Sequence, residues 1–476
     1  MSVAFDATAP TFPWRQPGGA RRWQRPAPVA AAAEAVVTPT HEPMPPTSPF
    51  RGVRWSFLYA AFLLYIFVIT TYQLNIGTIA VVAAIGGLLF QRDAFRLPSL
   101  LAWLGLFVVW CAIGYVKTEY PEIVWDFLFQ YMKLWMITLV ALNALRSRSH
   151  VRLFMIFFLG CFALYPLRGA MFNYYIYHEA LFGRAYWNYI YNNPNDLAAV
   201  TMLQLSLVAG LLVTEPRGWV RTAAQVGAGL LPMLILMTQS RAGFIALCVF
   251  VLCVLFGPRP NKSIYAEKLG RKAGSKKKVV ALVLVAAIVS VAAPTGVWER
   301  VGGLKGVADT EHLDQVDSEG SARQRFEIWK VAARIISDNP ISGVGLGGYN
   351  LAHESYAQLG GFDAGVQGKK DAHSTYLHVA AETGIPGLLI FLGLVLSSAF
   401  RAEQIRRMCR KVLPRRSAQL FYVEAGLLTF LVAGIFGSFA HLSFLYIHLA
   451  LLLVLAETCR RDMTSLLGTR RRSKHS

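Results

Sequence analysis

Long apolar segments alternate with short polar connections along most of the chain. Segments of this kind are typical of transmembrane helices, which need about 17–25 mostly apolar residues. We therefore predict an all-α, polytopic membrane protein with about 12 transmembrane helices. The predicted spans cover residues 55–71, 75–90, 99–116, 127–145, 151–168, 196–213, 222–239, 242–257, 279–295, 385–400, 419–438 and 441–457.

The composition agrees with this prediction. Of the 476 residues, 55% are hydrophobic and only 16% are charged, whereas soluble proteins carry about 25% charged residues. The six cysteines follow neither a disulfide framework nor a metal-ligand spacing. We expect no metal ion and no cofactor.

The net charge of +20 does not indicate a nucleic-acid partner. If the N-terminus is cytoplasmic, 34 of the 47 Lys and Arg residues fall in the predicted cytoplasmic segments or at their edges. Such an excess is the positive-inside pattern of membrane proteins. Both termini are therefore predicted to lie in the cytoplasm, and the plasma (inner) membrane of a bacterium is the expected location.

This orientation divides the chain into five parts. The longest polar connection becomes a large loop on the outer side, which is the periplasm if the cell is Gram-negative. The parts are a disordered cytoplasmic tail (1–50), spans 1–9 (51–295), the large helical loop (296–384), spans 10–12 (385–457) and a basic cytoplasmic tail (458–476).

A helix is predicted in the large loop, after Ser321. Ser321 and Gln324 have the spacing of a capping box, and Asn339-Pro340 would end the helix. The run GVGLGGY that follows permits tight turns and close backbone approach. The apolar face of the helix is expected to consist of Phe326, Trp329, Ala333 and Ile336.

A second loop helix is predicted after Asp371, its expected N-cap, with Gly384 at its C-terminal end. His373 would then lie in the first turn, where the helix dipole disfavours the imidazolium form. A neutral histidine can act as a general base; alternatively, His373 is a loop histidine bonded to a backbone carbonyl. His378 and Glu382 are four residues apart and are expected to pair with each other.

Several arginines are predicted on the outer side of the membrane, against the positive-inside pattern. Arg241 lies between two apolar spans and needs either a partner or a ligand, unless it only marks the end of a span. Arg323 and Arg325 stand near a helix N-terminus, where they form an anion site or a solvated face. Arg168 and Arg184 are further candidates for binding an anionic substrate.

The run YNNPND has two interpretations. Asn195 and its neighbours could bind a polar ligand, or they could cap the next helix with help from Pro194. Together with the outer arginines and His373, these residues would suit an anionic substrate held in the membrane, such as a lipid-linked pyrophosphate. A transporter is the alternative, although its sites are expected near the middle of the membrane.

Three motifs resemble those of the bacterial O-antigen ligase and polymerase superfamily. HSTYLHVAAETGIPG fits the ligase pattern of His, then Asn, Ser or Gln, nine residues, Gly, two residues and Gly, Thr or Tyr, with His373 and Gly384 at fixed positions. RFEIWKVAARIISDNPISGVGLGGY resembles the upstream segment with Arg four residues before Trp. QSRAGFIAL resembles the Ser-Arg-Gly start of a span, with Ala242 replacing Gly. The resemblance covers about residues 55–457.

The resemblance implies an inverting, metal-independent glycosyltransferase of cell-surface polysaccharide biosynthesis, including lipopolysaccharide or exopolysaccharide. Its donor would be a glycan linked to undecaprenyl pyrophosphate, and its acceptor a second glycan or lipid A-core. His373 would be the catalytic base, and Arg241 and Arg325 would bind the pyrophosphate. Arg325 fits better than Arg323 because it stands four residues before Trp329.

Several functions remain open at this stage. The resemblance does not separate a ligase from a polymerase, although no large domain follows the last span, which disfavours the protein-glycosylating branch. The tail 1–50 and the basic loop 258–278 are not features of the family. The other candidates are a transporter or flippase of lipid-linked glycans and a non-catalytic scaffold of an envelope polysaccharide assembly complex.

Overall fold

The computed structural model describes residues 42, 45–46, 48–73, 76–91, 95–258, 321–362 and 364–473. The predicted ninth span, nearly all of the basic loop 258–278 and most of the tail 1–50 lie outside the described residues. So does the first part of the large loop, up to residue 320.

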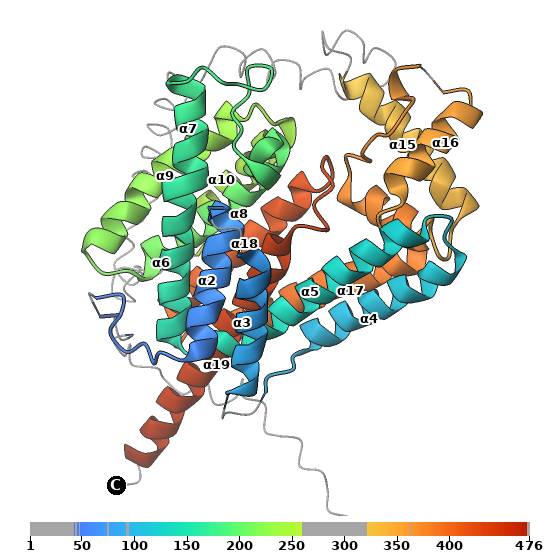
Figure 1. Ribbon diagram of the computed structural model, residues 1–476. Helices are drawn as coiled ribbons and strands as arrows, with labels where there is room; N and C mark the ends of the chain where they lie inside the picture. The colour runs from blue at the N-terminus through green and yellow to red at the C-terminus, as the bar shows by residue number, and fades with distance from the viewer. Residues whose placement is uncertain are drawn as a thin grey trace, which may run out of the picture. The chain divides into compact units, whose positions relative to one another are not determined.

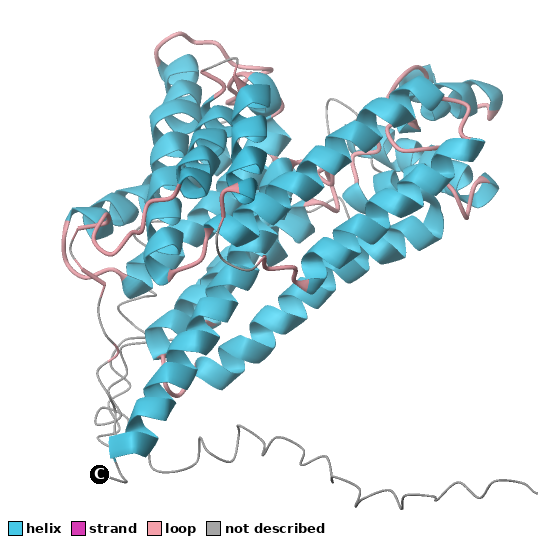
Figure 2. Cartoon of the chain, turned by 60° about the horizontal axis from the view of Figure 1, so that its bottom comes forward, coloured by secondary structure: helices cyan, strands magenta, loops and turns pink. Residues whose placement is uncertain are grey.

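The described residues form helices and connecting loops, with no strand (Figure 2). The all-helical prediction is therefore confirmed for this part of the chain. The longer helices are α2 (Phe57–Thr71), α3 (Gly77–Leu89), α4 (Ser99–Gly114), α5 (Pro121–Ala144), α6 (Arg148–Phe162), α7 (Arg168–Tyr175), α8 (Pro194–Thr214), α9 (Trp219–Met237), α10 (Arg241–Phe256), α15 (Ser321–Asp338), α16 (Tyr349–Leu359), α17 (Thr375–Cys409), α18 (Pro414–Ala433) and α19 (Ser443–Ser473).

Many of these helices have the length and composition of membrane spans. Seven helical stretches within the described residues are long and apolar enough to cross a membrane, and three apolar helices are shorter. Every predicted span that falls on described residues coincides with a helix. The predicted total of about 12 spans stays a prediction. The seven long stretches are Ser99–Lys117, Pro121–Ala144, Arg148–Tyr175, Pro194–Thr214, Trp219–Met237, Thr375–Cys409 and Ser443–Gly468.

Short polar residues begin several of the helices. Ser56, Ser147 and Ser240 each accept a hydrogen bond from an amide in the first turn of α2, α6 and α10. Asn193 does the same for α8, with Pro194 at the first helical position. The YNNPND run therefore caps a helix, as one of its two interpretations proposed.

The loop helix α15 ends where the sequence predicted, and its predicted start lies where the described residues resume; its buried face is different. Phe326 and Ala333 are exposed, and Trp329 and Ile336 are half-buried. The prediction of the apolar face was wrong because the helix packs on α16 and α17 through a neighbouring stripe (Figure 1). That stripe consists of Ile328, Val331, Ala332 and Ile335.

Gly384 divides α17 into two segments. Its φ of +70° and ψ of 178° are not helical, and a Cβ at this position would overlap the carbonyl group of Ile341. The first segment, from Thr375, packs against α15 and α16, and the apolar second segment packs beside α4 (Figure 1). Gly384 thus ends the first helical segment, as predicted, and the chain continues directly into a span.

Contacts between the helix connections fall into two sets. In the first set, His150 Nε2 lies 2.7 Å from the carbonyl oxygen of Arg54, and Asn143 Oδ1 accepts from the amide of Arg96 at 2.9 Å. Arg152 pairs with Glu215 at 2.7 Å. These contacts join the start of α2 to that of α6, the segment before α4 to the end of α5, and the start of α6 to the end of α8. We call this set the basic end.

The second set joins the opposite ends of the same helices. Tyr72, after α2, stacks on Tyr189 with ring centroids 4.5 Å apart. Thr118, after α4, donates to the carbonyl of Val344 at 2.7 Å. The amide of Thr375, at the start of α17, donates to the carbonyl of Gly434 after α18 at 2.8 Å. We call this set the site end, because it includes Thr375, which follows the candidate base His373 in the chain.

Candidate active site

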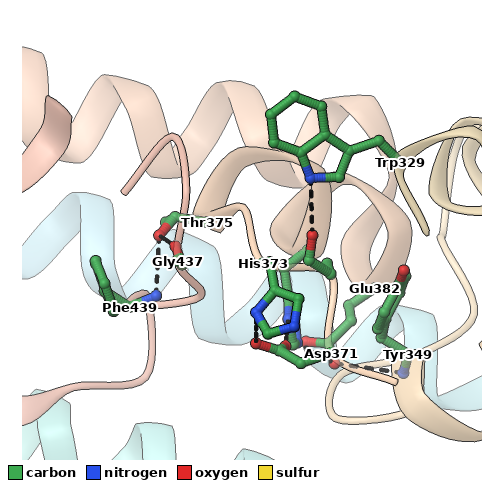
Figure 3. Close-up of polar contacts among 10 residues, drawn as sticks. Trp329, Tyr349, Asp371, His373, Thr375, Glu382, Gly437 and Phe439 are labelled. Carbon is green, nitrogen blue, oxygen red and sulfur yellow. Dashed lines mark hydrogen bonds and ion pairs between the residues drawn. The ribbon is translucent and has the colours of Figure 1, made fainter. Parts of the chain in front are cut away.

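His373 lies just before α17 in a strained backbone conformation. Its φ is +47°, in the left-handed region that residues other than glycine rarely adopt. Ala372, the residue before it, accepts a hydrogen bond from Nε1 of Trp329 at 3.1 Å (Figure 3). Backbone strain persists only where the surroundings hold it, and it is found preferentially at functional sites. The strain keeps His373 a candidate functional residue.

Thr375 fixes the chain on the other side of His373. Its hydroxyl donates to the carbonyl of Gly437 at 2.6 Å and accepts from the amide of Phe439 at 2.9 Å (Figure 3). The hydroxyl of the next residue, Tyr376, donates to the carbonyl of Leu431 at 2.8 Å. The start of α17 is thereby tied to the end of α18 and the connection that follows it, which leaves the His373 backbone little freedom to relax.

Two local predictions for this segment were wrong. Ser374, not Asp371, is the N-cap of α17, and it makes no side-chain capping hydrogen bond. His373 consequently precedes the helix instead of lying in its first turn. The physical reason is that the Asp371 carboxylate is engaged by the ring of His378, so it does not cap backbone amides.

Asp371 lies between two histidines. One of its carboxylate oxygens is 3.7 Å from Nδ1 of His373, and the other is 3.1 Å from Nδ1 of His378. The second ring nitrogen of His378 is 2.9 Å from Oε1 of Glu382, which confirms the predicted pairing of these two residues. Figure 3 shows Asp371 directly below the His373 ring.

The two carboxylates define the role of His378. An ionised carboxylate only accepts hydrogen bonds, and a neutral imidazole donates from one nitrogen only. Both ring nitrogens of His378 face carboxylate oxygens, so the ring satisfies both as an imidazolium. A histidine in this state has no lone pair to accept a proton. His378 therefore positions Asp371 and does not compete with His373 as a base.

His373 is kept in the neutral form by its surroundings. Burial lowers its pKa and the Arg325 guanidinium lowers it further, against the opposing charge of Asp371. Burial raises the pKa of Asp371, but the hydrogen bond and the charge of His378, with a contribution from His373, hold that pKa well below its usual range. At neutral pH the site thus contains an uncharged imidazole beside an ionised carboxylate.

Arg325 reaches this site from α15. Arg325 and Trp329 are four residues apart and so share one helix face, and Trp329 is bonded to the residue before His373. This placement explains the effect of Arg325 on the pKa of His373. Arg325 is half-buried, whereas Arg323 is exposed.

A cavity of about 250 Å³ lies beside this cluster. Asp196 from α8 and His441 from the α18–α19 connection join Asp371, His378 and Glu382 in its wall; neither Asp196 nor His441 was singled out from the sequence. Within the described residues, there is no group of three or more His, Cys, Asp or Glu side chains that could hold a metal ion. The other lining residues are Phe107, Phe127, Gln130, Tyr131, Asn193, Leu346, Gly347, Asn350, Val379, Thr383, Ser438 and Ala440.

A second cluster lies at the starts of α8 and α10. Oδ1 of Asn195 accepts hydrogen bonds from Arg184 Nη2 at 3.0 Å and from the Ser240 hydroxyl at 2.8 Å. Nε of Arg184 also donates to the carbonyl of Thr238 at 2.9 Å. Ser240 in turn caps α10, of which Arg241 is the first residue. Arg184 and Asn195 thus support the turn that presents Arg241.

The two clusters are linked through the start of α8. Asn195 belongs to the Arg241 cluster, and the next residue, Asp196, lines the cavity next to Asp371 and His378. Arg168 lies apart from these contacts: it is exposed, and its guanidinium lies 5.5 Å from the ring centre of Phe172.

The sequence could not identify the Asp371 network. Asp371 stands two residues before His373, and Glu382 stands four residues after His378. Both spacings are common, and from them we predicted only a helix N-cap at Asp371 and a pairing of His378 with Glu382. The signal that could have found the network is the density of titratable groups: Asp371, His373, His378 and Glu382 lie within twelve residues of an otherwise apolar chain.

The comparisons with known proteins agree with the motifs. The family model described as O-antigen ligase matches residues 226–392, a range that includes Arg241, Arg325 and His373. A comparison with curated proteins found no match. The family match confirms the resemblance that the three motifs indicated.

Proposed function

Because residues 226–392 carry the features of the O-antigen ligase family, we propose that the chain is a membrane glycosyltransferase of the O-antigen ligase or polymerase type. It transfers a glycan from undecaprenyl pyrophosphate to a hydroxyl group of an acceptor glycan or of lipid A-core. The observation that carries this proposal is a strained His373 whose ring lies 3.7 Å from the Asp371 carboxylate and whose pKa is lowered by burial and by the charge of Arg325.

In the proposed reaction, His373 is the general base. Its Nδ1 faces Asp371, so Nε2 takes the proton of the acceptor hydroxyl. The hydroxyl oxygen attacks the anomeric carbon from the face opposite the pyrophosphate, which inverts the configuration. Asp371 then stabilises the imidazolium that forms, as a carboxylate does beside any histidine base.

Arg325 and Arg241 act on the leaving group. As the bond between the anomeric carbon and the pyrophosphate oxygen breaks, its electron pair stays on the pyrophosphate, and the two arginines stabilise that negative charge. Preorganised positive charge at a leaving group is often the largest catalytic contribution. In this proposal the arginines do the work that a metal ion does in other glycosyltransferases, so the reaction needs none.

We place the reaction at the outer face of the membrane, with both termini in the cytoplasm. The support is that lysines and arginines are concentrated in alternate connections and that contacts join these connections into a basic end and a site end. The site residues 321–384 belong to the end that the charge pattern assigns to the periplasm.

The choice between a ligase and a polymerase depends on the acceptor, which we leave open. A transporter or flippase of the lipid-linked glycan would also need the arginines. A scaffold of an assembly complex would need none of these side chains. The neutral histidine beside an ionised carboxylate favours a reaction over both, because neither transport nor scaffolding requires a base.

Purified protein in vesicles with a lipid-pyrophosphate-linked glycan and an acceptor tests the proposal. We expect a new glycosidic bond, detected as a shift in acceptor mass. Movement of the donor across the vesicle membrane with no new bond would contradict the proposal and favour the transporter. In cells, deletion of the gene should leave unattached full-length chains for a ligase and single repeat units for a polymerase.

A further inference from the structure

A second polar cleft lies beside the Gly-rich segment and shares no lining residue with the cavity beside Asp371. It has a volume of about 360 Å³, within the range of about 300–1,000 Å³ that is typical of small-molecule sites. Its walls come from the α4–α5 connection, the segment after α15, and α16. The lining residues are Lys117, Glu119, Tyr120, Asp338, Asn339, Pro340, Ile341, Ser342, Gly343, Val344, Ala352 and Tyr356.

The cleft combines aromatic rings with hydrogen-bonding groups. Tyr120 and Tyr356 are half-buried and pack against a small core of α15, α16 and the start of α17, so both rings are held rigidly. The hydroxyl of Tyr356 accepts from Nδ2 of Asn339 at 3.1 Å, which leaves its own proton to donate. Flat aromatic faces bind the C–H face of a sugar ring, and carboxylate, amide and hydroxyl groups bind its hydroxyls.

The cleft has no excess of positive charge that would favour a phosphate as its ligand. Glu119 and Asp338 contribute two carboxylates, and Lys117 contributes one cation. Asp338 is paired with Arg334 at the surface, whereas Lys117 and Glu119 form no ion pair within the described residues and are exposed. A neutral polyol satisfies such a mixed set, which gives a pyrophosphate no net attraction.

The cleft is coupled directly to the candidate active site. The segment after α15, which forms one wall of the cleft, is hydrogen-bonded to the backbone of α17. The amide of Ile385 donates to the carbonyl of Pro340 at 2.8 Å, and the amide of Gly345 donates to the carbonyl of Glu382 at 3.0 Å. Glu382 is the carboxylate that holds His378. Gly343 has a φ of +64° and lies so close to the Glu382 backbone that a Cβ would overlap it.

We propose that this cleft is a saccharide subsite, which binds a sugar residue of the donor or of the acceptor glycan at a distance from the bond that is made. The inference rests on the proposed function, because it presumes that a glycan is bound at the site end. A subsite of this kind would hold a growing or full-length chain in register with His373, so it would affect glycan affinity without touching the reacting atoms.

The test uses variants of one exposed and one half-buried cleft residue, and the melting temperature of each variant in detergent checks that the fold is intact. Glu119→Gln and Tyr356→Phe each remove one hydrogen-bonding function, and Glu122→Gln, a charge on the first turn of α5 outside the cleft, is the matched control. We expect Glu119→Gln and Tyr356→Phe to raise KM for one glycan by about three- to tenfold, the effect of one hydrogen bond, with kcat unchanged. A rise for the donor alone assigns the subsite to the donor, and a rise for the acceptor alone assigns it to the acceptor.

Direct binding separates this inference from the proposed function. The oligosaccharide released from the donor by mild acid should bind wild-type protein more tightly than the Glu119→Gln variant, and inorganic pyrophosphate should not compete with it. Unchanged KM values for both glycans in both cleft variants, with normal transfer by the wild type, overturn the subsite and leave the proposed function standing. Absence of transfer by the wild type would overturn the proposed function. The difference in oligosaccharide affinity between the wild type and Glu119→Gln would then still show whether the cleft binds a saccharide.

Discussion

The basic end and the site end of the helices hold their charges in different ways. At the basic end, Arg152 binds both carboxylate oxygens of Glu215 at 2.7 and 2.8 Å, with both side chains almost fully buried. At the site end, Arg184 is held by a carbonyl and an amide oxygen, and the ring of His373 is 3.7 Å from its nearest carboxylate.

The charged groups at the two ends have different structural roles. A guanidinium bonded to a carboxylate has its field cancelled locally, so it stabilises the fold but offers little to a ligand. The basic end therefore uses a buried, bidentate ion pair to join helices. The site end instead gathers its titratable groups around His373, the candidate base, with His378 held between Asp371 and Glu382.

The largest effect is expected from His373→Ala. Loss of a positioned base lowers kcat by about 10²–10⁴-fold, measured as glycan transfer by equal amounts of inserted protein. The control is His178→Ala, which removes an exposed histidine between α7 and α8 and should leave transfer unchanged. Full activity of His373→Ala would rule out the assigned mechanism.

Arg325→Gln is expected to lower kcat by about 10²–10³-fold, the effect of removing one preorganised group from a developing negative charge. Lys330→Gln removes an exposed charge from the same helix and serves as the control. The two variants should insert equally well, as judged by membrane fractionation. Equal loss of activity in both would mean that overall charge, and not the position of Arg325, is what matters.

Glu215→Gln tests the basic end. Breaking a buried ion pair leaves Arg152 uncompensated and costs about 3–5 kcal/mol of stability, visible as a lower melting temperature in detergent. Transfer per folded molecule should not change, because the pair lies at the opposite end from the site. Glu457→Gln, in an exposed pair with Arg461, should cost only about 0–1 kcal/mol. A fall in kcat for Glu215→Gln would break the separation between the two ends.

The smallest effect is a shift in pH dependence. His373 must be neutral to accept a proton, so activity should rise with pH through its pKa, which burial and Arg325 place below the usual value of about 6.5. In Arg325→Gln the lowering by Arg325 is lost, and the acid limb of kcat should move to higher pH. The residual activity of this variant, measured from pH 4 to 8, checks the sign. A shift to lower pH would contradict the assignment of the base.

Features that depend on neighbouring residues were predicted better than features that depend on contacts in the folded chain. The apolar helices within the described residues, the capping of α8 by Asn193 and Pro194, and the turn at Gly384 depend on residues close in sequence, and the structure agrees with these interpretations. The loop helix α16 was not predicted. Gly343, Gly345 and Gly347 all have positive φ, as the predicted tight turns require. The buried face of α15 depends on distant segments, and the role of Asp371 depends on a side-chain contact with His378 that the spacing did not reveal; both were predicted wrongly.

The sequence alone therefore determined the apolar helices within the described residues, the alternation of charge between their connections, and His373, Arg241 and Arg325 as candidates, because apolar length, charge count and motif spacing are local properties. Only the tertiary structure decided how these candidates are held. Trp329 reaches Ala372, Thr375 reaches Gly437, and His378 takes the Asp371 carboxylate away from helix capping. These contacts decide that His373 is strained, that its pKa is lowered by Arg325, and that a second histidine five residues later has a different role. Each depends on the position of a partner that lies on another segment of the folded chain.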